Sequence, residues 1–310
     1  MSYFRLMKGS IVWIILSSII LYVVIIIFSD ISKISEQFIH AKIELVFLVF
    51  GIVVLSHIIK MFRQKELLHM LDEKITLKQN FVIYLAGLSL IFTPGGIGVF
   101  IKAHFLKQKF DIENDKSFPV IFLERFHDLL GATTIIFASL VISFNWLSAS
   151  LVVISSFLVL GIYLLISNLD VFSFVQKKLS KIKFVAEKLP KFSPNDSFFI
   201  LTRPKSMTKG WLISIAGWTL DSLAVYVGFL AFGIDLGYVL TSQIYFTSLG
   251  YGILSLIPGG IGVTEGIAEY MLVKQGLAIS VASSIVIFTR LATIWFATSV
   301  GIISTRFAFK

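Results

Sequence analysis

Two stretches of the sequence decide the fold: SLIPGGIGVTEGIAEYML, from Ser255 to Leu272, and SLIFTPGGIGVFIKAHFL, from Ser89 to Leu106. Each places Pro-Gly-Gly, followed by Ile-Gly-Val, inside apolar sequence. Proline lacks a backbone N–H and glycine loses much conformational entropy on folding, so both residues disfavour the middle of a helix. The duplicated motif therefore predicts a break in helical structure at two places in the chain.

The composition of the chain is that of a membrane protein. Its 310 residues are 56% hydrophobic and 14% aromatic, and the mean hydropathy is +0.90, far above the range of soluble domains. The sequence has no cysteine, which excludes a disulfide framework, a thiolate nucleophile and a cysteine-based metal site. We therefore predict an all-α polytopic membrane protein that forms a single domain over residues 1–310, with no metal or cofactor.

Six segments are long and apolar enough to cross a membrane, which takes about 20 mostly apolar residues. The first could be read as a secretory signal. It is longer than a typical signal core, however, and no small-residue cleavage site follows it, so we expect a retained span. The predicted spans are 11–28, 43–62, 117–144, 146–167, 211–232 and 277–305.

The two Pro-Gly-Gly segments are too short to cross. The apolar arm before the first triplet, residues 81–92, would reach only about 18 Å as a helix, little more than half of the hydrocarbon core. We therefore expect each triplet to form the tip of a re-entrant helical hairpin, so that the fold has six spans and two hairpins.

The distribution of Lys and Arg predicts the orientation, because these residues collect in cytoplasmic loops. If the N-terminus is inside and each hairpin returns to its own side, both termini are cytoplasmic, in the plasma membrane. The net charge of +9 then reflects orientation rather than nucleic acid binding. Only Lys33, Lys42 and Lys274 fall outside, whereas the cations expected in the cytoplasm are Lys60, Arg63, Lys65, Lys74, Lys78, Lys102, Lys107, Lys109, Lys116, Lys177, Lys178, Lys181, Lys183, Lys188, Lys191, Arg203, Lys205 and Lys209.

The long basic loop at 168–209 has its own pattern. Apolar residues recur there at helical spacing beside lysines, which indicates an amphipathic helix on the inner leaflet. A solvated basic connector is the alternative. The apolar residues are Val171, Val175, Ile182, Val185 and Leu189.

The repeat extends beyond the Pro-Gly-Gly motif. Gln79 lies 15 residues before Pro94, and Gln243 lies 15 before Pro258. Arg125 follows Pro94 by 31 residues, and Arg290 follows Pro258 by 32. The units are 43–144 and 211–305, each with a span, a hairpin and a span, and the linking region 145–209 contains one further span. The second unit would therefore enter the membrane in the opposite sense, an inverted repeat that is typical of secondary transporters.

The hairpin tips predict an anion site. Irregular backbone at membrane depth is tolerated where protein or water satisfies its polar groups, and glycine lets a ligand approach bare N–H groups. A helix that begins after each triplet would point its positive dipole end at the cavity between the tips. The alternative is that the triplets are packing kinks between close helices. The tip residues predicted to contact an anionic head group are Pro94, Gly95, Gly96, Pro258, Gly259 and Gly260.

Ionisable residues inside the spans sharpen this prediction, because such residues are costly at that depth and usually face a cavity. Arg125 and Arg290 are suited to phosphate. Glu124 and Asp128 lie one helical turn apart beside Arg125, and we expect them to hold Arg125 or to carry a coupling proton. An ion pair that merely locks two helices is the alternative for this cluster.

Three further acids complete the set. Glu265 and Glu269 lie one turn apart after the second triplet and either bind a cationic group or form a solvated outer mouth. Asp221 is a lone acid in a span and is expected to face the cavity. No metal-ligand spacing relates the histidines, so we expect them to be structural or interfacial: His57, His104 and His127.

The motifs resemble those of the transmembrane region of lysylphosphatidylglycerol synthases. The resemblance rests on PGGIGVTE at Pro258 to Glu265 and ERFHD at Glu124 to Asp128, and it covers about 11–305. In the first hairpin the family pattern has an acid just after the glycines and an arginine three residues on, where this chain has Val99 and Lys102. The resemblance implies translocation of lipids with modified head groups, with Lys102 at the head-group site.

We therefore expect a transporter or flippase for an anionic phospholipid, a glycolipid or a polyprenyl phosphate. An aminoacyl-transfer domain is not expected, because the largest loop has about 42 residues, too few for a catalytic fold. No nucleotide-binding loop is present, so ion coupling or downhill lipid flow would supply the energy. The alternatives are a membrane-embedded enzyme that uses Glu124, Asp128 and Glu265 as acid or base, and a binding subunit that presents lipid to a partner synthase. The expected partners are membrane lipids and either a second copy of the chain or such a synthase.

Overall fold

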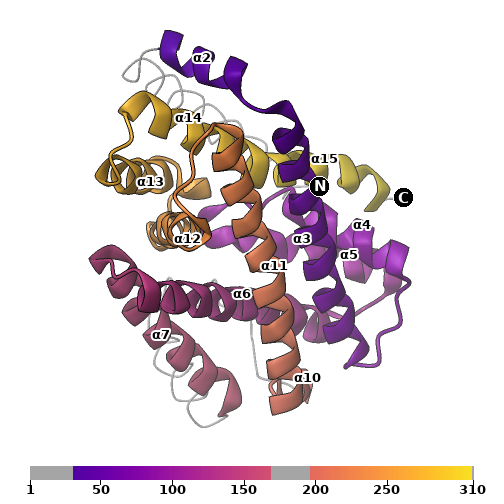
Figure 1. Ribbon diagram of the computed structural model, residues 1–310. Coiled ribbons are helices and arrows are strands. Elements are labelled where there is room, and N and C mark those ends of the chain that lie inside the picture. The colour runs from indigo at the N-terminus through magenta and orange to yellow at the C-terminus, as the bar shows by residue number, and fades with distance from the viewer. Residues whose placement is uncertain (1–30, 169–195, 309–310) are drawn as a thin grey trace.

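The computed structural model describes residues 31–168 and 196–308, and within these two ranges the chain forms helices and no strand (Figure 1). The span predicted at 11–28 and the amphipathic helix predicted at 171–189 lie outside the described residues. In the described part the all-helical prediction is therefore confirmed.

Within the described residues, five helical segments are long and apolar enough to cross a membrane, and each overlaps a predicted span. The ends differ mainly at two of them. The first described span continues past its predicted end at Phe62, and the fourth begins before Trp211, because polar residues at these ends are buried between helices instead of lying in loops. The five segments are α3 (Ile43–His69), α6 (Asn114–Ile142), α7 (Trp146–Ser167), α11 (Pro204–Ala231) and the continuous run of α14 (Ile279–Arg290), the π-helical turn η3 (Leu291–Trp295) and α15 (Phe296–Ala308).

The helix breaks predicted at the two Pro-Gly-Gly motifs are confirmed. Both Gly95 and Gly96 have positive φ, at 59° and 68°, and Gly259 and Gly260 follow at 64° and 65°. Side chains rarely adopt this left-handed conformation, which is why the sequence has glycine at these positions. We call Pro94–Phe100 (η1) the first turn and Pro258–Gly260 (η2) the second turn.

Shorter helices flank the two turns. The first turn joins α4 (Leu77–Leu88) to α5 (Ile101–Phe110), and the second turn joins α12 (Tyr238–Leu254) to α13 (Val263–Lys274). The first arm begins with a capping box, in which Thr76 accepts from the Gln79 backbone and the Gln79 side chain accepts from Thr76. The remaining short helices are α2 (Ile31–His40) and α10 (Asp196–Leu201).

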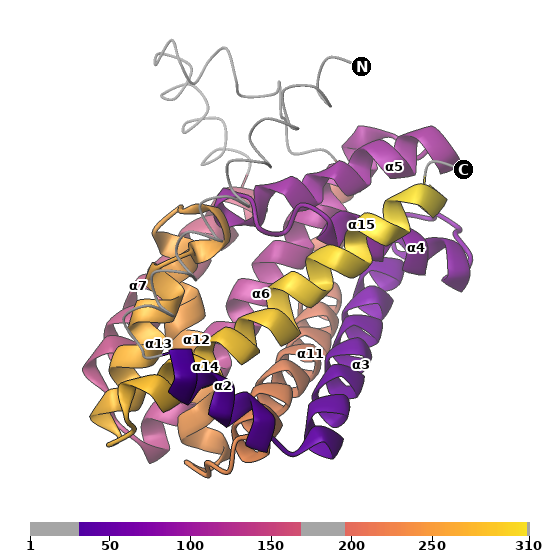
Figure 2. The ribbon, with the colours of Figure 1, turned by 90° about the horizontal axis from the view of Figure 1, so that it is seen from above.

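The centre of the structure is α11, which packs along α3 and crosses α6 (Figure 2). Small residues on α11 allow these close contacts, as is common between membrane helices. The Lys60 side chain packs on Gly217, the His127 ring packs on Gly210, and Gly131 of α6 lies against Ser214. Polar and charged side chains can therefore be buried between α3, α6 and α11.

The contacts between the two halves are reciprocal. The first arm of one half, α4, packs on α15 at the end of the other half, and α12 correspondingly packs on α6. The approach of α4 is close: a Cβ on Gly301 would lie 2.3 Å from the backbone nitrogen of Ser89. The first and second turns also contact each other. Each half thus places its broken helix pair against the last helix of the other.

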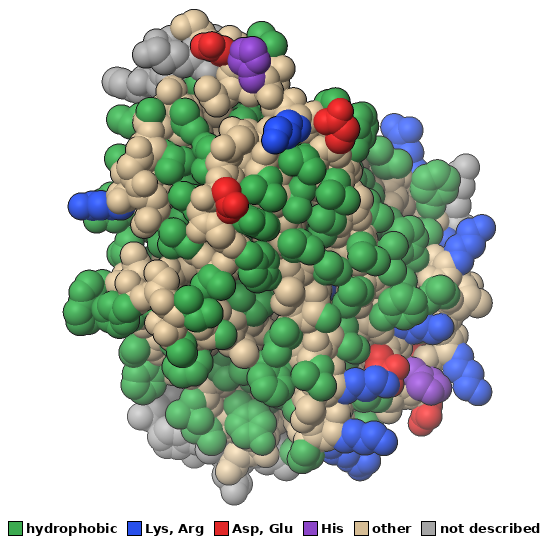
Figure 3. Space-filling model, viewed as in Figure 1, with side chains coloured by type: hydrophobic (Ala, Val, Ile, Leu, Met, Phe, Trp, Pro, Cys, Tyr) green, Lys and Arg blue, Asp and Glu red, His purple; other side chains and the backbone are tan. Residues whose placement is uncertain are grey.

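The surface of the described part separates by polarity. Hydrophobic side chains cover most of the face in Figure 3, and Lys and Arg gather where α4, α5 and α15 lie in Figure 1. This separation fits a multi-pass membrane protein. Three cations that the sequence assigned to the cytoplasmic side are instead buried, because they pair with acids inside the helix bundle: Lys60, Arg63 and Lys102.

Candidate functional site

A cavity of about 440 Å³ lies where the two turns meet. Gly95 and Gly96 of the first turn line it, together with Gly259 and Gly260 of the second. Its volume falls within the range of about 300–1,000 Å³ that is common for small-molecule sites. Pro94 and Pro258, which were also predicted to contact the head group, do not line the cavity. Their rings therefore shape the turns rather than the cavity wall.

The backbone N–H groups of the first turn already have partners. The Gly96 N–H donates to the Thr93 carbonyl at 2.7 Å, and the Gly98 N–H donates to Thr93 Oγ1 at 2.6 Å. Thr93 therefore closes the turn with its backbone and its side chain. The prediction of bare N–H groups at the tip is wrong for these two donors, because the turn satisfies them internally.

The second turn is closed by a carboxylate. The Gly260 N–H donates to the Ile257 carbonyl at 2.8 Å, and the Gly262 N–H donates to Glu265 Oε2 at 2.8 Å. Glu265 thus places a negative charge at the start of α13, where an anionic ligand was expected to bind the helix dipole. The prediction is again wrong for these donors, since the chain supplies its own anion.

Arg290 is tied to the second turn. Its Nε donates to Glu265 Oε1 at 2.8 Å and its Nη2 donates to the Gly259 carbonyl, and only 5% of the side chain is exposed. Arg290 lines the cavity as predicted, but much of its donor capacity holds the turn. Glu269, one turn beyond Glu265, does not line the cavity and accepts a hydrogen bond from the Ser283 hydroxyl at 2.7 Å.

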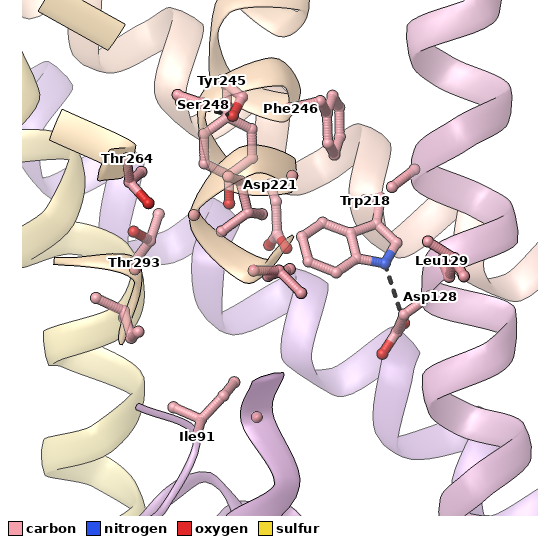
Figure 4. A pocket seen from close by; sticks show the side chains of 18 of the residues that line it. Ile91, Asp128, Leu129, Trp218, Asp221, Tyr245, Phe246, Ser248, Thr264 and Thr293 are labelled. Atoms are coloured by element: carbon pink, nitrogen blue, oxygen red, sulfur yellow. Dashed lines mark hydrogen bonds between the residues drawn. The ribbon is translucent and has the colours of Figure 1, made fainter. Parts of the chain in front are cut away.

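Arg125 faces the same cavity from α6 and is more open, with 30% of its side chain exposed. Its Nη2 lies 3.0 Å from Asp128 Oδ2. Asp128 also accepts from Arg63 Nη1 at 2.7 Å and from Trp218 Nε1 at 3.0 Å, the contact drawn in Figure 4. Arg63 donates in addition to the Ser214 hydroxyl. Asp128 therefore pairs with Arg125 at the cavity, as the sequence predicted, and with the buried Arg63 behind it.

Glu124 has a different partner from the one expected. It is fully buried and pairs with Lys102 of α5 rather than with Arg125, and neither residue lines the cavity. Lys102 also donates to Gln64 Oε1 at 2.9 Å, and Gln64 donates to Asn80 at 2.8 Å. Successive residues on a helix point about 100° apart, so Glu124 turns toward α5 while Arg125 turns toward the cavity.

Asp221 lines the cavity as predicted but is not a lone acid. It pairs with Lys60 of α3, whose ammonium group also lies 3.6 Å from the centre of the Trp218 ring. Figure 4 shows Asp221 beside Trp218 and Asp128, across from Thr264 and Thr293. This wall of the cavity is polar, and its Lys60–Asp221 pair is neutral.

Another wall of the cavity is apolar. It is formed by side chains of α6, α7 and α12, and two residues of α6, Phe126 and Thr133, also line a second hollow of about 340 Å³ against α7. The lining of the cavity therefore combines charged groups with a large apolar surface, and α6 contributes to both. The apolar residues of this wall include Phe122, Leu129, Ile136, Leu151, Leu158, Ile162, Ile253 and Leu254.

The three histidines occupy different surroundings. His57 lines the cavity with Nδ1 3.4 Å from the Tyr84 hydroxyl, His127 is buried against Gly210, and His104 is exposed. Across the described ranges, no group of three or more His, Asp or Glu residues could hold a metal ion.

Sequence reasoning missed Lys60, Arg63, Gln64 and Trp218 as members of the site, because the first three were placed in a cytoplasmic loop. Helical spacing was the available signal. Lys60 and Arg63 lie three residues apart, as do Trp218 and Asp221, so each pair shares a helix face if α3 continues beyond Phe62.

A family model described as the lysylphosphatidylglycerol synthase TM region matches residues 14–301. The chain belongs to this family. A UPF0104 membrane protein of Methanocaldococcus jannaschii is 24% identical over an alignment of 323 residues, gaps included, which covers 97% of this chain and 95% of that protein. Shorter matches join the chain to UPF0104 membrane proteins of Methanothermobacter thermautotrophicus, 27% identical over 103 residues, and Pyrococcus horikoshii, 28% over 99 residues. These shorter matches span 33% and 32% of this chain and 30% of each relative's length.

Proposed function

We propose that this family member moves a membrane lipid with an anionic head group between the two leaflets. The observation that carries the proposal is the cavity between the two turns, which is lined both by guanidinium groups, those of Arg125 and Arg290, and by an apolar surface of α6, α7 and α12. An amphiphile matches both surfaces: its phosphate would pair with Arg125, and its acyl chains would lie on the apolar wall.

The proposed mechanism uses the two halves as an inverted repeat of re-entrant hairpins that rock about the cavity. Support comes from the reciprocal packing of α4 on α15 and α12 on α6, and from the contact between the two turns. Each turn also joins two helices of which at least one has 12 residues or fewer, about 18 Å at most, which is shorter than the hydrocarbon core. The basic side of the molecule would face the cytoplasm in the plasma membrane, with both termini on that side.

Transport rather than catalysis is supported by the state of the carboxylates. Glu124, Asp128 and Glu265 are the residues that an acid–base mechanism would use, and each of them pairs with a buried or half-buried cation. We therefore assign these acids to the framework of the site.

The test is a flipping assay on the full chain in liposomes that contain a fluorescent phosphatidylglycerol, with quenching of the outer leaflet. We expect the wild-type protein to expose inner-leaflet lipid, and Arg125→Gln to slow this by about tenfold, the loss of one charge-assisted hydrogen bond. Lys205→Gln removes an exposed cation of α11 and should leave the rate unchanged. No exchange above empty liposomes would refute the proposal, and covalent change of the lipid would indicate an enzyme instead.

A further inference from the structure

The ion pairs around the cavity are not all balanced. Three of them join one cation to one carboxylate: Lys60 to Asp221, Lys102 to Glu124, and Arg290 to Glu265. Each such pair is neutral. The fourth group has three members, because Arg63 and Arg125 share Asp128. Two positive guanidinium groups and one negative carboxylate give this Arg63–Asp128–Arg125 triad a formal charge of +1.

No other acid in the described part of the chain pairs with either arginine of the triad. Trp218 adds a neutral donor to Asp128, and Ser214 adds a neutral acceptor for Arg63. The Nε and Nη2 atoms of Arg63 and the Nε atom of Arg125 make no hydrogen bond to a described residue. The positive charge of the triad is therefore uncompensated within the ranges 31–168 and 196–308.

This charge reaches the cavity through one residue. Arg63 is fully buried behind Asp128 and does not line the cavity. Arg125 lines the cavity with 30% of its side chain exposed. An excess positive charge that is largely withdrawn from water is costly, so the triad favours a ligand that brings one negative charge to Arg125.

From this arrangement we infer that the cavity selects a phosphodiester with a single negative charge and an otherwise uncharged head group. The inference rests on the proposed function, because it names the head-group class of the lipid that would be moved. One negative charge neutralises the triad. A phosphomonoester would bring a second negative charge, for which the described cations at the cavity leave no partner, since Lys60 and Arg290 already pair with acids. A zwitterionic head group would bring an ammonium to Asp221, which Lys60 already neutralises.

The test is native mass spectrometry of the full chain with an equimolar lipid mixture. The mixture contains phosphatidylglycerol and phosphatidylmethanol, which share a monoanionic phosphodiester, together with phosphatidic acid and phosphatidylethanolamine. We expect both monoanionic lipids to be retained about tenfold over the other two, which corresponds to one charge-assisted contact. Equal retention of phosphatidylethanolamine, or retention of phosphatidylglycerol without phosphatidylmethanol, would overturn the inference.

Variants separate net charge from direct contact. Arg63→Gln neutralises the triad although Arg63 cannot touch the ligand, so it should abolish the preference for monoanionic lipids, as Arg125→Gln should. Asp128→Asn raises the triad to +2 and should shift retention toward phosphatidic acid by about tenfold. Lys205→Gln should change neither preference, and unfolding temperatures of all variants identify any that fail to fold. A monoanion preference that survives Arg63→Gln in a folded protein would overturn the inference.

One competition arm identifies the source of the phosphodiester. Deacylated glycerophosphoglycerol added in excess should not displace phosphatidylglycerol, because it cannot use the apolar wall. Displacement at equal concentration would show a site for free phosphodiesters and overturn the lipid assignment. Selective lipid retention without flipping in liposomes would refute the proposed function and leave this inference standing. Flipping without selection by head-group charge would refute this inference and leave the proposed function standing.

Discussion

Arg125 and Arg290 occupy similar places in the two halves of the chain, 31 and 32 residues after their Pro-Gly-Gly motifs, but their surroundings differ. Arg290 is tied to Glu265 and to the Gly259 carbonyl, with 5% of its side chain exposed. Among the described residues, Arg125 pairs with one carboxylate, which it shares with a second arginine, and 30% of its side chain is exposed. One arginine closes a turn and the other is available to the cavity.

The surroundings of the two arginines differ because of Glu124, the residue just before Arg125 in the first half. There, Glu124 of α6 makes a buried link to α5, the helix that follows the first turn, through Lys102. In the second half, Arg290 at the end of α14 makes the corresponding link, through Glu265 of α13. The helix-to-helix link is thus repeated with its charges reversed. Because an acid makes the link in the first half, the neighbouring arginine is free to face the cavity.

The largest effect on stability is expected at Arg290, which bonds to the second turn. Arg290→Gln would leave Glu265 buried without its cation, which costs about 3–5 kcal/mol, and we expect a matching loss in the free energy of unfolding in detergent. The matched control is the double variant with Glu265→Gln, which removes both charges and should recover most of the loss. A single variant as stable as the wild type would show that Arg290 does not hold the second turn.

A smaller effect separates the two turns themselves. Both Gly260 and Gly95 have positive φ, so an alanine at either position would be held in the left-handed conformation. The alanine Cβ in Gly260→Ala would lie 2.9 Å from Gly252 Cα, whereas the nearest atom to the Cβ in Gly95→Ala would be 3.8 Å away. The left-handed conformation alone costs about 1–3 kcal/mol, so we expect Gly95→Ala to lose an amount in this range and Gly260→Ala to lose more. Thermal unfolding of both variants measures the difference. Equal losses would mean that the approach of α12 to the second turn does not matter for stability.

The smallest effect on stability is expected at Arg125. In Arg125→Gln, Asp128 keeps its contacts with Arg63 and Trp218, so the free energy of unfolding should change by less than about 1 kcal/mol. The same unfolding assay as for Arg290→Gln makes the comparison direct. A loss as large as that of Arg290→Gln would show that Arg125 also has a framework role, and the contrast between the halves would fail.

Much of the fold could be predicted because its signals are local. Five described spans follow from apolar runs, and both helix breaks follow from Pro-Gly-Gly, which acts through backbone conformation alone. The positions of Arg125, Arg290, Asp128 and Asp221 at the cavity were also predicted, because ionisable residues in spans usually face one. The repeat units, the anion-binding roles and the direction of the termini stay predictions.

The ion-pair partners could not be predicted from the sequence. The pairs Lys60 with Asp221 and Arg63 with Asp128 join residues that are 161 and 65 positions apart. Whether Lys60 and Arg63 belong to a loop or to a span depends on where α3 ends, and α3 continues because α11 and α6 supply acids for these cations. Glu124 and Arg125 show the same limit, since their division between α5 and the cavity depends on which neighbour each helix face meets.

The sequence by itself determined that the chain is a helical membrane protein with two duplicated helix breaks, because hydropathy and backbone preference act over a few residues. Only the tertiary structure decided which breaks meet, which charges neutralise one another and which arginine is left for the cavity. Those outcomes depend on burial: a charge in a low-dielectric interior must find a partner across the fold, and only packing determines which partner is near.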